Sequence, residues 1–149
     1  MATALTASTI LQQRWGDAWI RGTGADSFWW QLERFQHQFQ HQRPSNVLLA
    51  EPESIRFLAA FFATVQQPCR VWLANPHWGQ QEWAQVAAQC QPDCVIGEVP
   101  SIIKTSGSVQ ASENRHRTLA DPPTPPLPHS PTPSILIPTG GSSGNIRFA

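Results

Sequence analysis

The run Asn46-Val47-Leu48-Leu49-Ala50 decides the fold class of this chain. Four consecutive apolar residues leave no polar face for solvent, unlike the alternating pattern of a strand that is buried on one side. A short continuous run of this kind is typical of a strand in a parallel sheet whose two faces are both covered. We therefore expect a buried strand here, with helices on both faces of its sheet.

Helical stripes and further apolar runs alternate after this strand. The spacing predicts a helix over residues 53–66, a strand over 70–74, a helix over 78–90 and a strand over 94–97, with turns at Pro68, Asn75-Pro76 and Pro92. The residues expected to face inward are Ile55, Leu58, Phe62 and Val65 in the first helix and Trp83, Val86, Ala87 and Cys90 in the second. Residues 46–99 therefore read as a βαβαβ unit with a parallel sheet and right-handed crossovers.

Residues 1–45 read as an N-terminal helical segment. A helix that ends before Pro44 is predicted from large apolar residues spaced by four, three and four, with Asp26 or Ser27 as its cap. A shorter helix is expected over residues 9–20. The expected packing residues are Phe28, Leu32, Phe35 and Phe39 in the longer helix and Ile10, Trp15 and Trp19 in the shorter one.

Residues 100–133 have the composition of a linker. Residues 104–114 are rich in Ser, Thr and Gly, and seven prolines lie between Asp121 and Pro133. Such a segment buries too little apolar surface to offset the entropy of ordering it. Its P-x-x-P spacings also occur in ligands of adaptor domains, but no basic residue flanks them at a useful distance, and we favour the linker.

A glycine- and hydroxyl-rich loop closes the chain, within Ile135-Leu-Ile-Pro-Thr-Gly-Gly-Ser-Ser-Gly-Asn-Ile-Arg-Phe-Ala149. Its glycines let the backbone bring N–H groups close to an anion, its hydroxyls add donors, and its arginine adds a positive charge that pairs with phosphate oxygens. The predicted phosphate-binding residues are Thr139, Gly140, Gly141, Ser142, Ser143, Gly144 and Arg147. We expect residues 134–149 to be the beginning of a phosphate-binding region.

Three other glycine motifs fit this loop less well. A Walker loop requires a Lys-Ser/Thr pair that is missing, and the dinucleotide fingerprint fails because Gly140 and Gly141 are adjacent. The hydrolase elbow G-x-S-x-G matches literally at residues 140–144, but it requires a following helix. Residues 146–148 instead have the pattern of a strand.

Residues 139–148 resemble the T-[SG]-G-[ST]-[ST]-G-x-P-K-G signature of the adenylate-forming superfamily, which contains acyl-CoA synthetases, nonribosomal adenylation domains and luciferases. Three positions depart from it, since Ile146 stands where that superfamily has Pro, Arg147 where it has Lys and Phe148 where it has Gly. The variant is similar to the o-succinylbenzoate-CoA ligase branch of cyanobacteria and plastids, which serves phylloquinone and menaquinone synthesis. The order of a helix and two βα crossovers before the loop also resembles the start of that fold.

This resemblance implies an α/β fold that is the incomplete N-terminal part of the large domain of an adenylate-forming enzyme. The implied reaction joins a carboxylate, here o-succinylbenzoate, to AMP and passes the acyl group to coenzyme A, with ATP and Mg²⁺ as cofactors. In the family, the adenine, ribose and magnesium sites and a catalytic lysine follow the loop. We therefore assign no catalytic residue to these 149 residues and expect them alone to be an inactive, truncated or incomplete piece that lacks its C-terminal remainder.

Composition and charge exclude several other classes. Ten basic and ten acidic residues balance, so nothing indicates a nucleic-acid partner. No apolar run is long enough to span a bilayer and no secretory signal is recognisable, so we expect a soluble, cytoplasmic protein.

No metal site is predicted from the sequence. The three cysteines Cys69, Cys90 and Cys94 lack zinc-site spacing and are expected to be small buried residues. Glu33, His37 and His41 share one helix face among glutamines, but three turns are too far apart for one ion, and we interpret them as a solvated polar face.

A non-catalytic function is the alternative. In it, the chain is a small α/β binding module whose proline-rich segment recruits a partner, and the glycine loop is a flexible tail. The response of the loop to nucleotide separates the two hypotheses.

Overall fold

A parallel four-stranded sheet forms the centre of the protein, as seen in a computed structural model that describes residues 6–17, 19–22, 24–105, 133–140 and 145–149. The sheet contains β1 (Asn46–Ala50), β2 (Arg70–Leu73), β3 (Cys94–Gly97) and β4 (Ser134–Leu136), in the order β3-β1-β2-β4. All three strand pairs are parallel. The predicted α/β class with a parallel sheet is confirmed.

Strand β1 is the most deeply buried element. Val47, Leu48, Leu49 and Ala50 are each 0% exposed. Val47 and Leu49 belong to the apolar cluster on one face of the sheet, and Leu48 and Ala50 belong to the cluster on the other. The continuous apolar run thus contributes buried side chains to the clusters on both faces of the sheet, as expected for a covered central strand.

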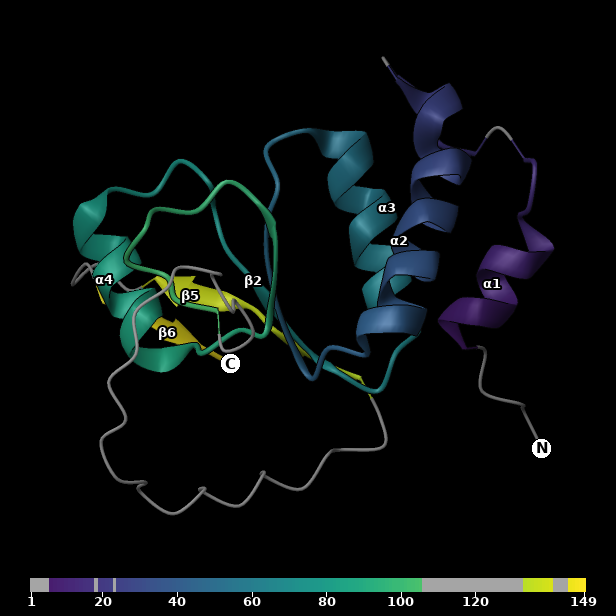
Figure 1. Cartoon of the computed structure of the whole chain (residues 1–149). Coiled ribbons are helices and arrows are strands. Elements are labelled where there is room, and N and C mark those ends of the chain that lie inside the picture. Colours follow the sequence, from purple (N-terminus) through teal and green to yellow (C-terminus); the bar gives the residue numbers. More distant parts are fainter. Residues whose placement is uncertain (1–5, 18, 23, 106–132, 141–144) are drawn as a thin grey trace, which may run out of the picture.

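Helices lie on both faces of this sheet. Helices α2 (Phe28–Gln42) and α3 (Ser54–Thr64) lie side by side on one face, and α4 (Gln80–Gln89) lies on the other (Figure 1). The short helix α1 (Ala7–Gln13) and the 3-10 turn η1 (Ala25–Ser27) precede α2, and α1 lies outermost on the α2 side. The crossovers after β1 and β2 therefore use opposite faces. None of the helices within the described ranges is long and apolar enough to span a membrane.

The predicted stripe of α2 is confirmed. Phe28, Leu32, Phe35 and Phe39 are at most 6% exposed. The helix stops because Arg43 adopts a left-handed conformation, with φ of 45°, before Pro44. Ser27 occupies the cap position, but its hydroxyl donates to the Gly24 carbonyl and accepts from the Gln31 amide instead of capping the helix.

Helix α3 packs against the core with the four residues that we predicted, but other residues of the helix are more deeply buried. Only Ile55 of the four predicted residues is fully buried, whereas Leu58, Phe62 and Val65 are half-buried. Small residues fill the centre of its contact, and they are Ala59, Ala60, Ala63 and Thr64, each 0% exposed. They let the helix axis approach its neighbours closely, and the buried Thr64 hydroxyl is satisfied by donating to the Ala60 carbonyl at 2.6 Å.

The first helix is shorter than predicted. It covers residues 7–13 instead of 9–20, and Gly16, with φ of 79°, follows its end. Trp15 and Trp19 are 54% and 38% exposed, although their rings still touch those of Trp29 and Phe28. The predicted inward residues of α4 are largely confirmed, since Trp83, Val86 and Cys90 are buried and Ala87 is half-buried.

The predicted linker of residues 100–133 begins inside the packed structure. Ile103 is 8% exposed and belongs to the same cluster as Trp83 and Val86 of α4. Residues 106–132 of the linker lie outside the described residues.

Two glycines with positive φ provide a test of the packing at the sheet edge. Gly97 has φ of 96°, and a Cβ there would overlap the backbone of Ala50, its partner in β1. Gly16 also has positive φ, but a Cβ there meets nothing within 4 Å. We expect Gly97→Ala to lower the free energy of unfolding by about 3 kcal/mol or more and Gly16→Ala by only about 1 kcal/mol, because the second change adds strain without overlap. Urea unfolding measures both, and equal losses would contradict the assigned clash.

Candidate functional site

The predicted phosphate loop joins two paired strands. Strands β5 (Pro138–Gly140) and β6 (Ile146–Phe148) are antiparallel, with Thr139 opposite Arg147 and Gly140 opposite Ile146. Two backbone hydrogen bonds, of 3.0 and 3.1 Å, join the Ile137 and Ala149 positions at the open end of the hairpin. The two ends of the loop are therefore held together, and residues 146–148 form the strand that their pattern predicts.

Helix α4 anchors the second strand of this hairpin through one residue. The Ile146 N–H donates to the Gln85 side-chain oxygen at 2.6 Å, and the Gln89 side-chain amide donates to the Ile146 carbonyl at 3.0 Å. The Ile146 side chain is 7% exposed. At the other end of β6, the ring of Phe148 meets the ring of Trp72 in a T-shaped contact at 4.9 Å. The hairpin is thus fixed to the face of the sheet that α4 covers (Figure 1).

The structure places three of the predicted site residues. Thr139 and Arg147 lie opposite each other, and the Thr139 hydroxyl donates to the Arg147 carbonyl at 3.0 Å. Both residues are exposed, and Arg147 takes part in no ion pair within the described ranges. Gly140 forms the last strand pair before the loop. Gly141, Ser142, Ser143 and Gly144 lie outside the described residues.

A second candidate site lies at the carboxyl ends of the strands. A cavity of about 570 Å³ opens between the segments that follow β2 and β3, and it is lined by Pro76, Trp78, Gln80, Trp83, Glu98, Val99, Pro100, Ser101 and Ile102. The rings of Trp78 and Trp83 meet at 5.9 Å in its wall. Ligands of open α/β sheets commonly bind at the carboxyl ends of the strands, which is where this cavity lies.

The cavity and the hairpin are separate places on α4. Trp83 of the cavity wall lies in the first half of the helix, whereas Gln85 and Gln89 hold the hairpin further along it. Neither Thr139 nor Arg147 lines the cavity. Our sequence reasoning assigned Trp83 to the core and missed Glu98, although the position of Glu98 directly after a strand was the available signal.

The three cysteines are buried, as predicted, and their environment makes them poor nucleophiles. Burial, followed by the nearby Asp93 carboxylate, raises the pKa of the Cys69 and Cys90 thiols to about 12 and that of Cys94 to about 11. Asp93 itself accepts backbone N–H groups of Ser45 and Asn46 at 2.8 and 3.0 Å. Asp93 therefore joins the amino ends of β1 and β3, and the raised pKa values make the three thiols poor nucleophiles.

Comparison of the chain with family models, with curated proteins and with solved structures finds no match. Within the described part of the chain, no three His, Cys, Asp or Glu side chains gather in a way that would hold a metal ion.

The raised thiol pKa values predict a loss of stability in alkali. Thiols in the unfolded chain ionise near the ordinary value of 9.0, whereas those in the folded protein stay protonated until about pH 11 to 12. The unfolded state then binds fewer protons, so the free energy of unfolding should fall as pH rises from 9 to 11, by up to about 1.4 kcal/mol per pH unit for each thiol.

The composition makes this measurement simple, because the chain has no tyrosine and only one lysine, Lys104. Urea unfolding at each pH gives the curve. A stability that stays flat between pH 9 and 11 would contradict the burial of these thiols.

A second prediction concerns the anchor of the hairpin. Replacing both Gln85 and Gln89 with Ala removes the two side-chain hydrogen bonds to Ile146. We expect hydrogen exchange at the Ile146 amide to accelerate at least tenfold, because its hydrogen is then bound only by solvent, while exchange at Val71 in β2 stays unchanged. Equal acceleration at both amides would show general destabilisation instead of release of the hairpin.

Proposed function

We propose that residues 134–149 contain the beginning of the phosphate-binding region of an ATP-dependent acyl-CoA ligase of the adenylate-forming kind, and that the chain is the N-terminal part of its large domain. The observation that carries this proposal is the hairpin, which holds both ends of the loop while the guanidinium-bearing Arg147 is exposed beside it. A loop between fixed ends can present several backbone N–H groups to one anion. The sequence at that loop is the one that resembles the adenylate-forming signature.

The departures from the signature fit the way this hairpin is held. The superfamily has Pro where this chain has Ile146, and proline has no N–H to donate, whereas the Ile146 N–H is bound by Gln85. The superfamily has Gly where this chain has Phe148, whose ring packs on Trp72. Ile146 and Phe148 therefore dock β6 on α4 and the sheet through contacts that Pro and Gly at these positions could not make.

The chemistry of adenylation assigns a role to the loop. A carboxylate is a poor electrophile, because a thiol that attacks it would have to expel an oxide ion. Joining the carboxylate to AMP first gives the acyl group a good leaving group, AMP. The loop N–H groups would bind the β- and γ-phosphates while negative charge moves onto pyrophosphate, and Arg147 would stabilise that charge. Mg²⁺ bound to the nucleotide would share this charge, and coenzyme A would accept the acyl group in the second step.

The substrate that we propose is that of the o-succinylbenzoate-CoA ligase branch, to which the variant signature is similar. We propose o-succinylbenzoate as the carboxylate and menaquinone or phylloquinone synthesis as the setting. The proposal assigns only phosphate contact to the residues of this chain.

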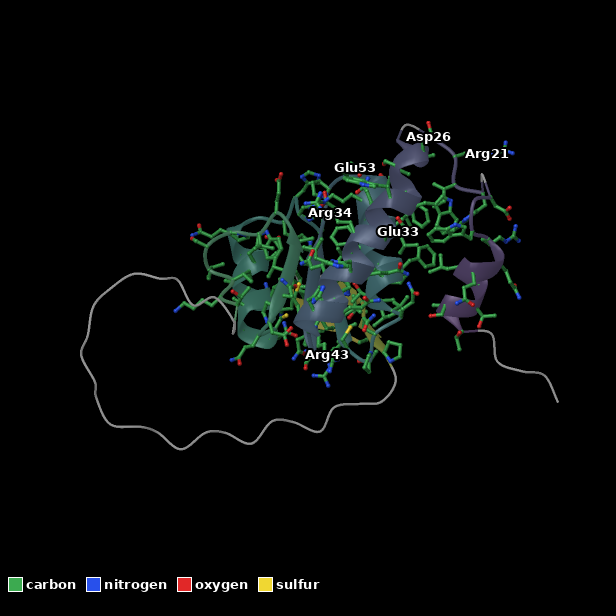
Figure 2. The ribbon with its side chains drawn as sticks, turned by 45° about the vertical axis from the view of Figure 1, so that its right-hand side comes forward. Arg21, Asp26, Glu33, Arg34, Arg43 and Glu53 are labelled. Carbon is green, nitrogen blue, oxygen red and sulfur yellow. The ribbon has the colours of Figure 1, made fainter. Side chains whose placement is uncertain are left out.

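Titration with pyrophosphate tests the proposed loop. We expect amide shifts at Gly141 and Gly144 in ¹⁵N-labelled protein, and we expect Arg147→Ala to weaken binding about tenfold, or 1.4 kcal/mol, by removing the fixed charge. The matched control is Arg21→Ala, which removes another exposed arginine, on the α1 side of the molecule and far from the hairpin (Figure 2). Equal weakening by both variants would reduce the effect to net charge and contradict a built site.

An activity measurement tests the ligase function itself. In an enzyme that contains this segment, Arg147→Ala should slow o-succinylbenzoate-dependent ATP–pyrophosphate exchange at least tenfold. An unchanged rate would remove Arg147 from the adenylation step.

The cavity at the carboxyl edge favours a second candidate function. A non-catalytic α/β module would use the wall of Trp78 and Trp83, with Glu98 at the rim, to bind a small ligand. The proline-rich segment that would recruit a partner lies outside the described residues. In this case pyrophosphate leaves the loop amides unshifted, which separates the two functions.

A further inference from the structure

The side chains of two histidines on α2 approach each other closely. The Nε2 atoms of His37 and His41 are 3.2 Å apart, and the two ring centroids are 4.5 Å apart. Both side chains are exposed, one turn apart on the helix face that points away from the buried stripe. An ion from solvent can therefore approach this pair of exposed side chains.

The distance between these nitrogens matches a metal chelate. A transition metal holds imidazole nitrogens at about 2.0–2.1 Å, so two ligands at an angle between 90° and 109° have nitrogens about 2.9–3.3 Å apart. A hydrogen bond between two neutral imidazoles gives the same separation, and it is the competing explanation. In the chelate, both Nε2 atoms present lone pairs and both Nδ1 atoms carry the hydrogen.

We propose that His37 and His41 form a surface site for a divalent transition-metal ion, with water completing the coordination. The helix that carries them is rigidly held, because Phe35 and Phe39 on its opposite face are buried and Phe39 is 0% exposed. A chelate on a fixed backbone loses little entropy when it binds. His41 also lies in the last turn of α2, where the helix dipole favours a cation.

The ligand set selects the class of ion. Imidazole suits Zn²⁺, Ni²⁺ and Cu²⁺, whereas Mg²⁺ prefers oxygen ligands. Glu33, one turn before His37, does not complete a three-residue group. The site is therefore independent of the Mg²⁺ that would accompany ATP at the hairpin on the other face of the sheet.

Calorimetric titration of the whole chain with zinc chloride tests the site. We expect His37→Gln and His41→Gln each to weaken zinc binding at least fivefold and the double variant to be little worse than either, because one remaining imidazole no longer chelates. Magnesium chloride should produce no binding. A loss below fivefold in either single variant would overturn the chelate.

Two controls use the histidines of the chain itself. His77→Gln removes a single exposed imidazole and should change zinc affinity less than twofold. The double substitution His41→Gln with Gln42→His keeps the number of imidazoles but places the second one about 100° further around the helix, and it should bind as weakly as His41→Gln. Equal affinity of this shifted variant and the wild type would show that spacing does not matter and would overturn the proposal.

A measurement on the unaltered protein does not depend on the folding of any variant. In long-range ¹H–¹⁵N spectra, zinc should shift the Nε2 resonances of His37 and His41 and leave both rings as the Nδ1–H tautomer. Shifts confined to other histidines would overturn the assignment.

Discussion

The two-sided pairing of β1 is the constraint on which the rest of the structure depends. Its backbone pairs with β2 on one side and β3 on the other, and four of its side chains are fully buried. A buried peptide group without a partner costs more than a typical hydrogen bond contributes, so both neighbours must be present. Since successive residues point to opposite faces, both faces also require apolar covers.

That requirement places a layer of helices on each face of the sheet, and the two sides have different roles. Helices α2 and α3 cover one face with phenylalanine rings and alanines, and their outer surface carries the two histidines. The other face holds α4, the carboxyl-edge cavity and the hairpin. The hairpin of the proposed nucleotide site therefore lies on the α4 side of the sheet, and α2, which carries the two histidines, lies on the opposite side (Figure 1).

The hairpin shows how side chains distant in sequence position a loop. Gln85 and Gln89 bind a residue 61 and 57 positions away, and both bonds reach the backbone of Ile146. Helical periodicity marks these glutamines as exposed polar residues, so the pattern alone cannot identify them as anchors. The same holds for Ile103, whose burial depends on α4 lying above it.

The sequence by itself determined the fold class and most of the elements. The run from Val47 to Ala50 and the stripe from Phe28 to Phe39 each specify one environment, because a continuous apolar strand and a strict helical stripe have few other uses. Composition likewise marked the loop at residues 139–147 as a candidate phosphate site, and that function stays a prediction.

Only the tertiary structure decided which residues of α3 are most deeply buried, where the hairpin docks and which carboxyl-edge residues line a cavity. Three alanines of α3 are fully buried because only small side chains fit where the helix packs closely against its neighbours. Hydrophobicity alone would favour the larger side chains. The same reasoning applies to the 3.2 Å between the histidine nitrogens, since i, i+4 spacing permits that approach but side-chain rotamers produce it. Distances between groups are properties of the folded chain, and sequence patterns encode only which groups share a face.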